Sequence, residues 1–436
     1  MRYVIVGSGV AGFSAIEAIR SIDVAGEIVM VSDDAYGYYS RPGLAYYLTG
    51  ELQDKALYPR TKDDYRRLNF KFIKARATRI LREEHTLELD GKSRLTYDKL
   101  LIAVGASALP MNIPNSNLEG VVKLDHFADA NNILNLAKRG KTAVVVGGGI
   151  TALEITEGLL ARGMKVHYLL RGDRYWSSVL DERESKTVQG HLQAEGVELH
   201  FHAELKEIIG KKNRVTAVRL GNGQAMKCDL LAYAIGIRPR LELVRAIGLN
   251  LDRGILADEH LQTNDPDIFA AGDVAQVFDP LSGRSVLDSL WNPAREQGRV
   301  AGMNMAGRKS AYLKSPPFNV TRLAGLTTTI IGAVGRGKDE DIFGIARGDS
   351  ETWRSLPDVM VAQSGFEVNR LRLILGEEKM LGAVVMGDQT LSLPLQKMIA
   401  HGADISPIRE KLLTPNAPIA NLIADFWTAW RKQAAL

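Results

Sequence analysis

The chain has 436 residues, and this length predicts about three domains. Hydrophobic residues make up 45% of the chain and charged residues 24%, a balance that excludes a disordered or collagen-like protein. The formal net charge of +4 is small and gives only weak support for an anionic ligand or partner.

The cysteine count excludes several kinds of redox site. The one cysteine, Cys228, cannot form an internal disulfide, a Cys-x-x-Cys pair or a multi-cysteine metal site. A lone thiol suits the reducing cytosol, and the apolar strand that begins at Tyr3 leaves no room for a signal peptide. No uncharged apolar run reaches the ~18 residues of a membrane span. We therefore expect a cytoplasmic protein.

The first predicted unit lies at the N-terminus. Residues 3–6 form an apolar strand, the Gly-x-Gly-x-x-Gly turn Gly7–Gly12 follows, and residues 13–22 are typical of a helix. A second strand at 28–31 precedes Asp33, which lies 21 residues after Gly12. Such a turn can also serve plain strand-to-helix packing, but this context predicts a pyrophosphate at the turn and ribose hydroxyls at Asp33.

The same pattern recurs 140 residues later. Residues 142–146 form a strand, a second glycine turn covers 147–152, residues 153–160 are helical, and residues 166–170 form the next strand. Two such copies predict an α/β protein with two Rossmann-like, three-layer dinucleotide-binding domains.

The pattern changes at about Pro316. Residues 371–375, a turn at Gly376 and residues 380–386 predict a β-hairpin within a smaller C-terminal α+β domain. Farther on, apolar residues from Ile419 to Trp430 recur at helical spacing. That amphipathic tail is expected to pack on the third domain or on a dimer partner, and an interfacial membrane helix is the alternative.

The run Ile268–Asp273, which ends in Ala-Gly-Asp, is the most specific string. With the two glycine turns and the Ala103–Gly105 turn, it resembles the FAD-dependent pyridine nucleotide oxidoreductases, which are flavoproteins with two dinucleotide-binding domains. The resemblance implies an FAD-binding domain at 1–112 and 247–315, with an NAD(P)H-binding domain inserted at 113–246. It further implies a C-terminal α+β dimerisation domain at 316–410 and a tail at 411–436.

The resemblance assigns residues to each cofactor. For FAD it implies that the pyrophosphate is bound by Gly7, Gly9, Val10, Ala11 and Gly12, and the adenosine ribose by Asp33. Ala77 would contact the adenine, and the turn at Ala103 and Gly105 would also lie at FAD. Arg41 would lie beside the flavin, and Asp273 would bind the ribityl chain. For NAD(P)H it implies Gly147, Gly149, Ile150, Glu154, Arg171 and Gly236. Glu154, the one catalytic candidate, would steer the nicotinamide or a proton.

The absence of a redox-active cysteine reduces the number of branches of the family that the chain can resemble. Pro42 stands where some branches carry a redox cysteine, and Cys228 is expected to be a packing residue. What remains resembles ferredoxin and rubredoxin reductases and the flavin portion of nitrite reductase, although Tyr46 stands where ferredoxin reductases commonly carry a lysine.

This branch implies an NAD(P)H oxidoreductase that passes electrons through FAD to a small iron–sulfur protein or a partner subunit, as a homodimer. The alternatives are a redox switch of the apoptosis-inducing-factor type and a membrane-docked quinone reductase. No nucleic-acid-binding module is recognisable.

Two further features concern ligands. The strand at 166–170 ends without an acid and Arg171 comes next, so we expect NADPH to be preferred through its 2′-phosphate, with a solvated arginine as the alternative. Asp173 has the spacing of a ribose acid but lies beyond the strand end, beside Arg174. His200 and His202 lie two residues apart without a visible third ligand, so we expect no metal site.

Overall fold

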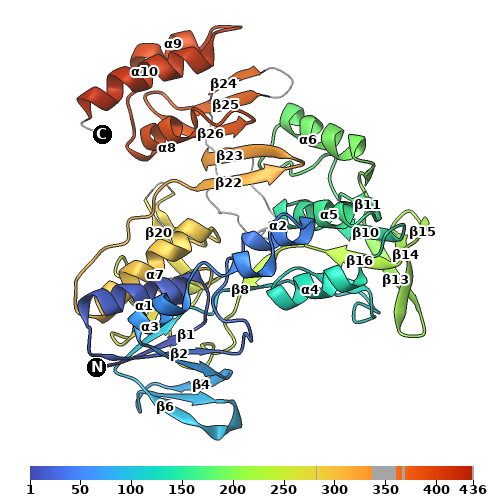
Figure 1. Ribbon diagram of the computed structural model, residues 1–436. Coiled ribbons are helices and arrows are strands. Elements are labelled where there is room, and N and C mark those ends of the chain that lie inside the picture. The colour runs from blue at the N-terminus through green and yellow to red at the C-terminus, as the bar shows by residue number, and fades with distance from the viewer. Residues whose placement is uncertain (281, 336–359, 366–368, 435–436) are drawn as a thin grey trace.

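The computed structural model describes residues 1–280, 282–335, 360–365 and 369–434. They form two parallel sheets flanked by helices and a third, antiparallel sheet that lies above both in Figure 1. The expectation of an α/β protein with two Rossmann-like units and an additional α+β unit is therefore confirmed.

The first parallel sheet has the strand order β19-β7-β1-β2-β3. Its strands are β1 (Arg2–Val6), β2 (Glu27–Ser32), β3 (Lys71–Lys74), β7 (Lys99–Ile102) and β19 (Ile268–Ala270). Two small sheets flank it. One is antiparallel and consists of β4 (Ala77–Leu81), β5 (Thr86–Leu89) and β6 (Arg94–Thr96). In the other, β20 (Ala275–Asp279) pairs antiparallel with β21 (Arg284–Val286) and parallel with β18 (Ile255–Ala257). Residues Val4, Ile5, Leu100 and Leu101 are fully buried, as a parallel sheet covered on both faces requires.

Helices α1 (Val10–Ile22) and α7 (Trp291–Met305) pack against each other beside this sheet, although 268 residues lie between the end of α1 and the start of α7. Their contact is closer than side chains would permit. A Cβ added at Gly298 would lie 2.0 Å from the carbonyl oxygen of Ala11, and one at Gly302 would lie 2.5 Å from that of Ala15. The two glycines thus bring the backbone of α7 against α1.

The second parallel sheet has the order β12-β11-β10-β16-β9. Its strands are β9 (Val121–Lys123), β10 (Thr142–Val146), β11 (Lys165–Leu169), β12 (Glu198–His200) and β16 (Leu230–Tyr233). Helices α4 (Phe127–Leu136), α5 (Ile150–Ala161) and α6 (Glu182–Ala194) accompany it, and β13 (Leu205–Lys211), β14 (Arg214–Leu220) and β15 (Ala225–Lys227) form a small antiparallel sheet on the opposite face.

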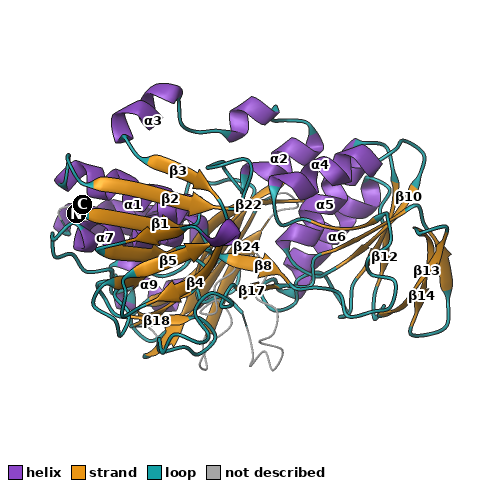
Figure 2. Cartoon of the chain, turned by 90° about the horizontal axis from the view of Figure 1, so that it is seen from below, coloured by secondary structure: helices purple, strands orange, loops and turns teal. Residues whose placement is uncertain are grey.

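The chain enters and leaves this second unit through one short ribbon. Strand β8 (Ala106–Ala108) pairs antiparallel with β17 (Ile237–Pro239). Helix α2 (Gly43–Thr49) follows the first strands of the first sheet and precedes α3 (Lys62–Leu68). It contacts α5 closely, because a Cβ added at Gly158 of α5 would lie 2.7 Å from the Cβ of Leu48 in α2. Figure 2 shows α2 and α5 between the two parallel sheets, with β13 and β14 at the outer end.

The third sheet is antiparallel, with the order β22-β23-β26-β25-β24. Its strands are β22 (Phe318–Leu323), β23 (Leu326–Gly332), β24 (Met360–Gly365), β25 (Arg370–Leu375) and β26 (Met380–Met386). The expected hairpin is present as β25 and β26. Helices α8 (Ser392–Ala400), α9 (Ser406–Leu413) and α10 (Ile419–Gln433) cover one face.

The apolar face of α10 packs on its own third sheet and helices. Ile419 and Ile423 are buried there, and Trp427 and Trp430 are partly buried against the same cluster. Within the described part of the chain, no helix has the length and apolar character needed to cross a membrane.

Two arginines of β25 join the third sheet to α6. The Arg372 Nε donates to Glu184 Oε1 at 2.8 Å, and its Nη2 donates to the Val179 carbonyl at 2.8 Å. Glu184 is fully buried, and Arg370 forms an ion pair with the helix-capping Asp181. This contact fixes the third sheet to the second unit.

Candidate functional site

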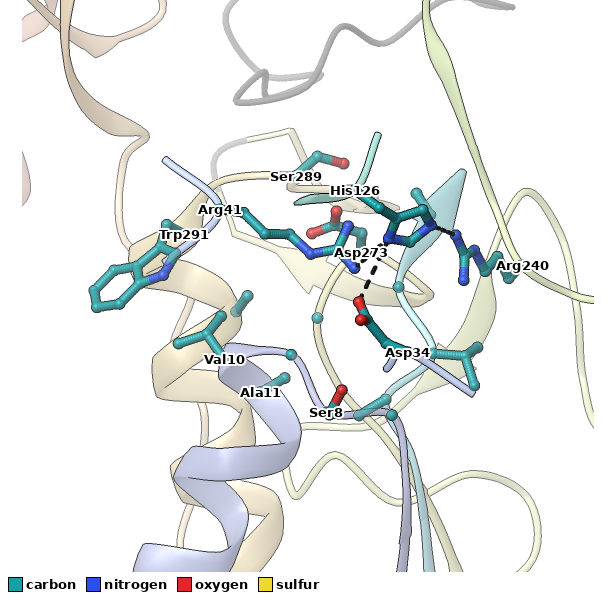
Figure 3. Close-up of a pocket in the computed structure, with 18 of the residues that line it drawn as sticks. Ser8, Val10, Ala11, Asp34, Arg41, His126, Arg240, Asp273, Ser289 and Trp291 are labelled. Carbon is teal, nitrogen blue, oxygen red and sulfur yellow. Dashed lines mark hydrogen bonds and ion pairs between the residues drawn. The ribbon is translucent and has the colours of Figure 1, made fainter. Parts of the chain in front are cut away.

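A cavity of about 740 Å³ lies where the three sheets approach one another. Its wall includes the β1–α1 turn, the start of α5 and strand β22. Figure 3 shows Val10 and Ala11 at the start of α1 on one side and Asp34, His126 and Arg240 on the other. Residues from each of the three sheet units therefore contribute to one site.

The first glycine turn presents bare backbone to this cavity. Gly7 has φ +115°, and a Cβ there would lie 2.2 Å from the Ala103 carbonyl oxygen, so only glycine fits. A Cβ at Gly12 would lie 2.2 Å from the carbonyl oxygen of Gly7. A Cβ at Gly9, in contrast, would have no atom of another residue within 4 Å, apart from its two neighbours in the chain. Gly9 thus leaves room for a ligand beside the start of α1.

Most residues expected at FAD line this cavity. They are Gly7, Gly9, Val10, Ala11, Asp33, Arg41, Ala77, Ala103, Gly105 and Asp273. Asp33 comes directly after β2 and is exposed, and Asp273 follows β19 and Gly272. The Gly272 N–H donates to Gln297 Oε1 at 2.8 Å, which ties this turn to α7. Gly12 does not line the cavity and serves the turn instead.

A charged cluster that the sequence did not reveal lies around His126. Arg240 Nη2 lies 2.7 Å from His126 Nε2, and Arg41 Nη2 lies 3.3 Å from His126 Nδ1. Asp34 Oδ2 is 3.7 Å from Nδ1 on the cavity side, and Asp125, only 1% exposed, lies within 3.9 Å of both arginines. Figure 3 shows His126 with Arg41, Arg240 and Asp34, and the two guanidinium groups lie at the cavity wall, where they can bind an anionic group.

A second set of polar residues lies where α5 faces β22. Arg322 donates to both carboxylate oxygens of Glu51, at 2.6 and 2.8 Å, and its Cζ lies 5.1 Å from the centre of the Tyr46 ring. Glu157, one helical turn after Glu154 on α5, also lines the cavity. Burial raises the pKa of Glu157 to about 7, although Arg322 and the Gly325 N–H act in the opposite direction. Glu157 is therefore a group that can hold a proton near neutral pH.

Four of the six residues expected at NAD(P)H line two separate hollows. Ile150 and Glu154 line the large cavity, whereas Gly149 and Gly236 line a smaller hollow beside it. Gly147 has φ +148°, and its Cβ would lie 2.3 Å from the Ala234 carbonyl oxygen. Arg171 lines neither hollow and is exposed just beyond β11. These positions follow the carboxyl edge of the second sheet, the usual place for a nucleotide.

Arg174, three residues after Arg171, forms an ion pair with the residue before it. Arg174 Nη1 forms an ion pair with Asp173 Oδ2 at 3.0 Å. The guanidinium of Arg174 and the carboxylate of Asp173 thus partly neutralise each other's charge.

A fully buried ion cluster involves the segment that carries Ser289 and Trp291 to the cavity. Lys314 Nζ lies 3.4 Å from Asp288 Oδ2 and 3.8 Å from Asp279 Oδ1, and all three side chains are fully buried. Burial raises the pKa of Asp288 to about 6, while Lys314 lowers it and Asp273 adds to the increase. The carboxylate of Asp273 thus acts electrostatically on the buried Asp288 of this cluster.

The two histidines that lie close in the sequence, His200 and His202, lie apart in the structure. His202 lies past the end of β12 with φ +51° and is exposed. His200 instead lies beside His167 of β11, with His200 Nε2 and His167 Nδ1 3.2 Å apart. Pairing between strands 33 residues apart along the chain makes this contact, and sequence spacing does not reveal it.

Comparisons with known proteins agree with this geometry. Residues 1–298 match the family described as pyridine nucleotide-disulphide oxidoreductase. The chain is 30% identical over 329 residues to an NADH oxidase of Methanocaldococcus jannaschii, which covers 72% of this chain and 71% of the relative. It is 29% identical over 349 residues to a rubredoxin-NAD(+) reductase of Pseudomonas putida, covering 79% and 89% respectively.

The fold comparison extends to the C-terminal sheet. A chain of the crystallised covalent putidaredoxin reductase–putidaredoxin complex superposes with a TM-score of 0.84 at 24% identity. The superposition covers 97% of this chain and 98% of the other, so the likeness includes all three sheet units.

Proposed function

Because the chain belongs to the pyridine nucleotide-disulphide oxidoreductase family, whose cofactors are FAD and NAD(P)H, we propose that it passes electrons from NAD(P)H through FAD to a small iron–sulfur protein or a partner subunit. The relative named rubredoxin-NAD(+) reductase supports this class of acceptor. The single observation that carries the proposal is the cavity of about 740 Å³ that joins the first glycine turn to Asp273 and to α5.

The residues present fit FAD. The open Gly9 turn at the start of α1 suits a pyrophosphate, and Asp33 at the end of β2 suits the adenosine ribose. Asp273, at the opposite side of the turn, would accept hydrogen bonds from the ribityl hydroxyls. When bound, FAD supplies the chemistry of accepting a hydride and releasing electrons, while the protein supplies orientation and electrostatics.

The polar residues of the cavity receive proposed roles on the same basis. Arg41, fixed by His126 and Asp125, would hold positive charge beside the flavin. Glu154 would position the nicotinamide from the α5 side of the cavity, and Glu157 would hold a proton behind it. Arg322 of β22 and Tyr46 of α2 would close this part of the cavity and exclude water.

The choice of nicotinamide depends on Arg171. Because Arg171 is exposed directly after the end of β11, where the adenosine ribose of a nicotinamide cofactor is usually bound, it would be the residue that binds the 2′-phosphate of NADPH. We expect kcat/KM to be higher for NADPH, and Arg171→Ala to reduce that preference by roughly tenfold. Arg183→Ala, in the first turn of α6, serves as the control for loss of one charge. A higher kcat/KM for NADH in the unaltered protein, in keeping with the names of two relatives, would contradict this role.

Anaerobic reduction tests the function itself. Purified protein should be yellow, lose its colour with a nicotinamide donor, and regain it rapidly when an oxidised rubredoxin or ferredoxin is added. Asp273→Ala should lower FAD affinity at least several-fold, because a charge-assisted hydrogen bond contributes about 1.5–3 kcal/mol. A protein that cannot be loaded with FAD would refute the proposal. A reduced form that persists with every iron–sulfur acceptor would favour the redox-switch alternative.

The oligomeric state is a separate prediction. The resemblance implies a homodimer, and the packing of α10 on its own sheet leaves that implication untested. Light scattering during size-exclusion chromatography would measure it directly.

A further inference from the structure

A cluster of metal-ligating side chains lies outside the cavity, on the second sheet. β11 and the edge strand β12 run parallel, with His167 opposite Glu198 and Leu169 opposite His200. Glu198 and His200 are two residues apart, so their side chains emerge on the same face of the sheet. That face is the one covered elsewhere by β13 and β14.

Two of the three distances between ligand atoms in the cluster are close to those in a coordination shell. His167 Nδ1 lies 3.2 Å from Glu198 Oε2 and 3.2 Å from His200 Nε2. The ligand atoms all lie within 4.8 Å of one another, and no other such group of three occurs in the described ranges. Zinc binds nitrogen and oxygen at about 2.0–2.2 Å, which places ligand atoms roughly 3.3–3.5 Å apart in a tetrahedral site.

Hydrogen bonding alone satisfies this arrangement poorly. His167 Nδ1 carries either one proton or one lone pair, yet it faces a carboxylate oxygen and a second ring nitrogen at the same distance. A cation placed among the three atoms would use a lone pair from each. The site is also accessible to an ion from solvent, because the Glu198 side chain is 69% exposed. The His167 side chain lies deeper and is 21% exposed.

We propose that His167, Glu198 and His200 form a binding site for Zn²⁺. Two imidazoles and one carboxylate are a borderline donor set that suits zinc and excludes Mg²⁺ and Ca²⁺, which prefer oxygen ligands. Water completes the fourth position from the solvent side. The ion would fasten the short edge strand β12 to β11 and leave the FAD cavity untouched.

Calorimetric titration of ZnCl₂ into tag-free, flavin-loaded, full-length protein tests the site. We expect one equivalent to bind in the micromolar range, with an increase in Tm that EDTA reverses. His167→Gln and His200→Gln should each weaken binding by at least about tenfold, because each removes a ligand. Glu198→Gln should weaken it less, and MgCl₂ should give no binding heat.

His202→Asn is the matched control, because His202 is exposed, lies two residues from His200 and has a positive φ that asparagine also adopts. It should bind Zn²⁺ like the unaltered protein. The flavin absorbance and circular dichroism of each variant establish that it is folded. Unaltered protein that binds no Zn²⁺, or a His167→Gln/His200→Gln protein with undiminished affinity, would overturn the proposal.

Discussion

Gly298 shows how much one residue can decide at the proposed cofactor site. The missing side chain lets α7 rest on the Ala11 carbonyl, and Ala11 belongs to the turn that lines the cavity. The close crossing of α1 and α7 therefore positions the residues expected to bind the pyrophosphate. Gly190 of α6 is a helix glycine of the opposite kind, because a Cβ there would meet no atom within 4 Å.

Alanine substitutions separate these two roles. Gly298→Ala should destabilise the protein by about 1–3 kcal/mol and lower its FAD content, because a methyl group would displace α1. Gly190→Ala should stabilise it by about 0.5–1 kcal/mol, because alanine is the better helix former. Urea unfolding and flavin absorbance measure both effects. Equal changes in the two variants would show that the crossing is not tightly packed.

A second prediction at the residue scale concerns Glu157. The folded protein holds its pKa near 7, above the ordinary value of 4.5, because burial disfavours the charged form. The folded state therefore binds more protons than the unfolded state between these values, so stability falls as pH rises through this window. Glu157→Gln removes this loss. Relative to the unaltered protein, the variant should gain up to about 3 kcal/mol between pH 4.5 and pH 8.

Unfolding of flavin-loaded protein in urea at several pH values would measure that gain. Glu410→Gln on the exposed surface of α9 provides the control for loss of one negative charge. A difference between the Glu157→Gln and unaltered proteins that does not change with pH would contradict the raised pKa.

At the scale of elements, the contact between α6 and β25 is decisive for the third sheet. Arg372→Met would remove the guanidinium that donates to the fully buried Glu184 carboxylate and leave only Arg370, whose Nε lies 3.6 Å away, and we expect a loss of about 3–5 kcal/mol. Arg372→Met combined with Glu184→Met should recover most of that loss. Arg219→Met breaks the exposed pair with Glu207 and should cost at most about 1 kcal/mol. Similar losses in both single variants would argue against a buried pair.

The elements themselves were largely predictable, and their contacts were not. The strand, glycine turn and helix of each nucleotide unit are contiguous, so Gly7–Gly12 and the Asp273 run are visible in the sequence. Arg322 and Glu51 are 271 residues apart, and Arg240 and His126 are 114 apart, so only the folded chain brings them together. Helix boundaries also moved, since α1 begins at Val10 within the glycine turn.

For the whole molecule, the route of electrons should not involve a thiol. Cys228 is 5% exposed, lies in the core between the second sheet and β13–β15, and has a pKa raised to about 12, mainly by burial. Iodoacetamide at pH 8 should therefore leave the NAD(P)H-to-dye activity unchanged, and Cys228→Ser should retain that activity. Loss of activity in a folded, flavin-loaded Cys228→Ser protein would contradict this expectation.

The ribbon of β8 and β17 also has a consequence for synthesis on the ribosome. The second parallel sheet is complete once residue 233 has emerged, whereas the first sheet still lacks β19 and α7, which begin at residues 268 and 291. Domains generally fold as units in the order in which they are synthesised. Here the inserted unit can fold while the N-terminal strands wait. The cavity is lined by residues as far along the chain as Arg322, so it can be complete only after β22 has been synthesised, and the proposed cofactor site forms late in translation.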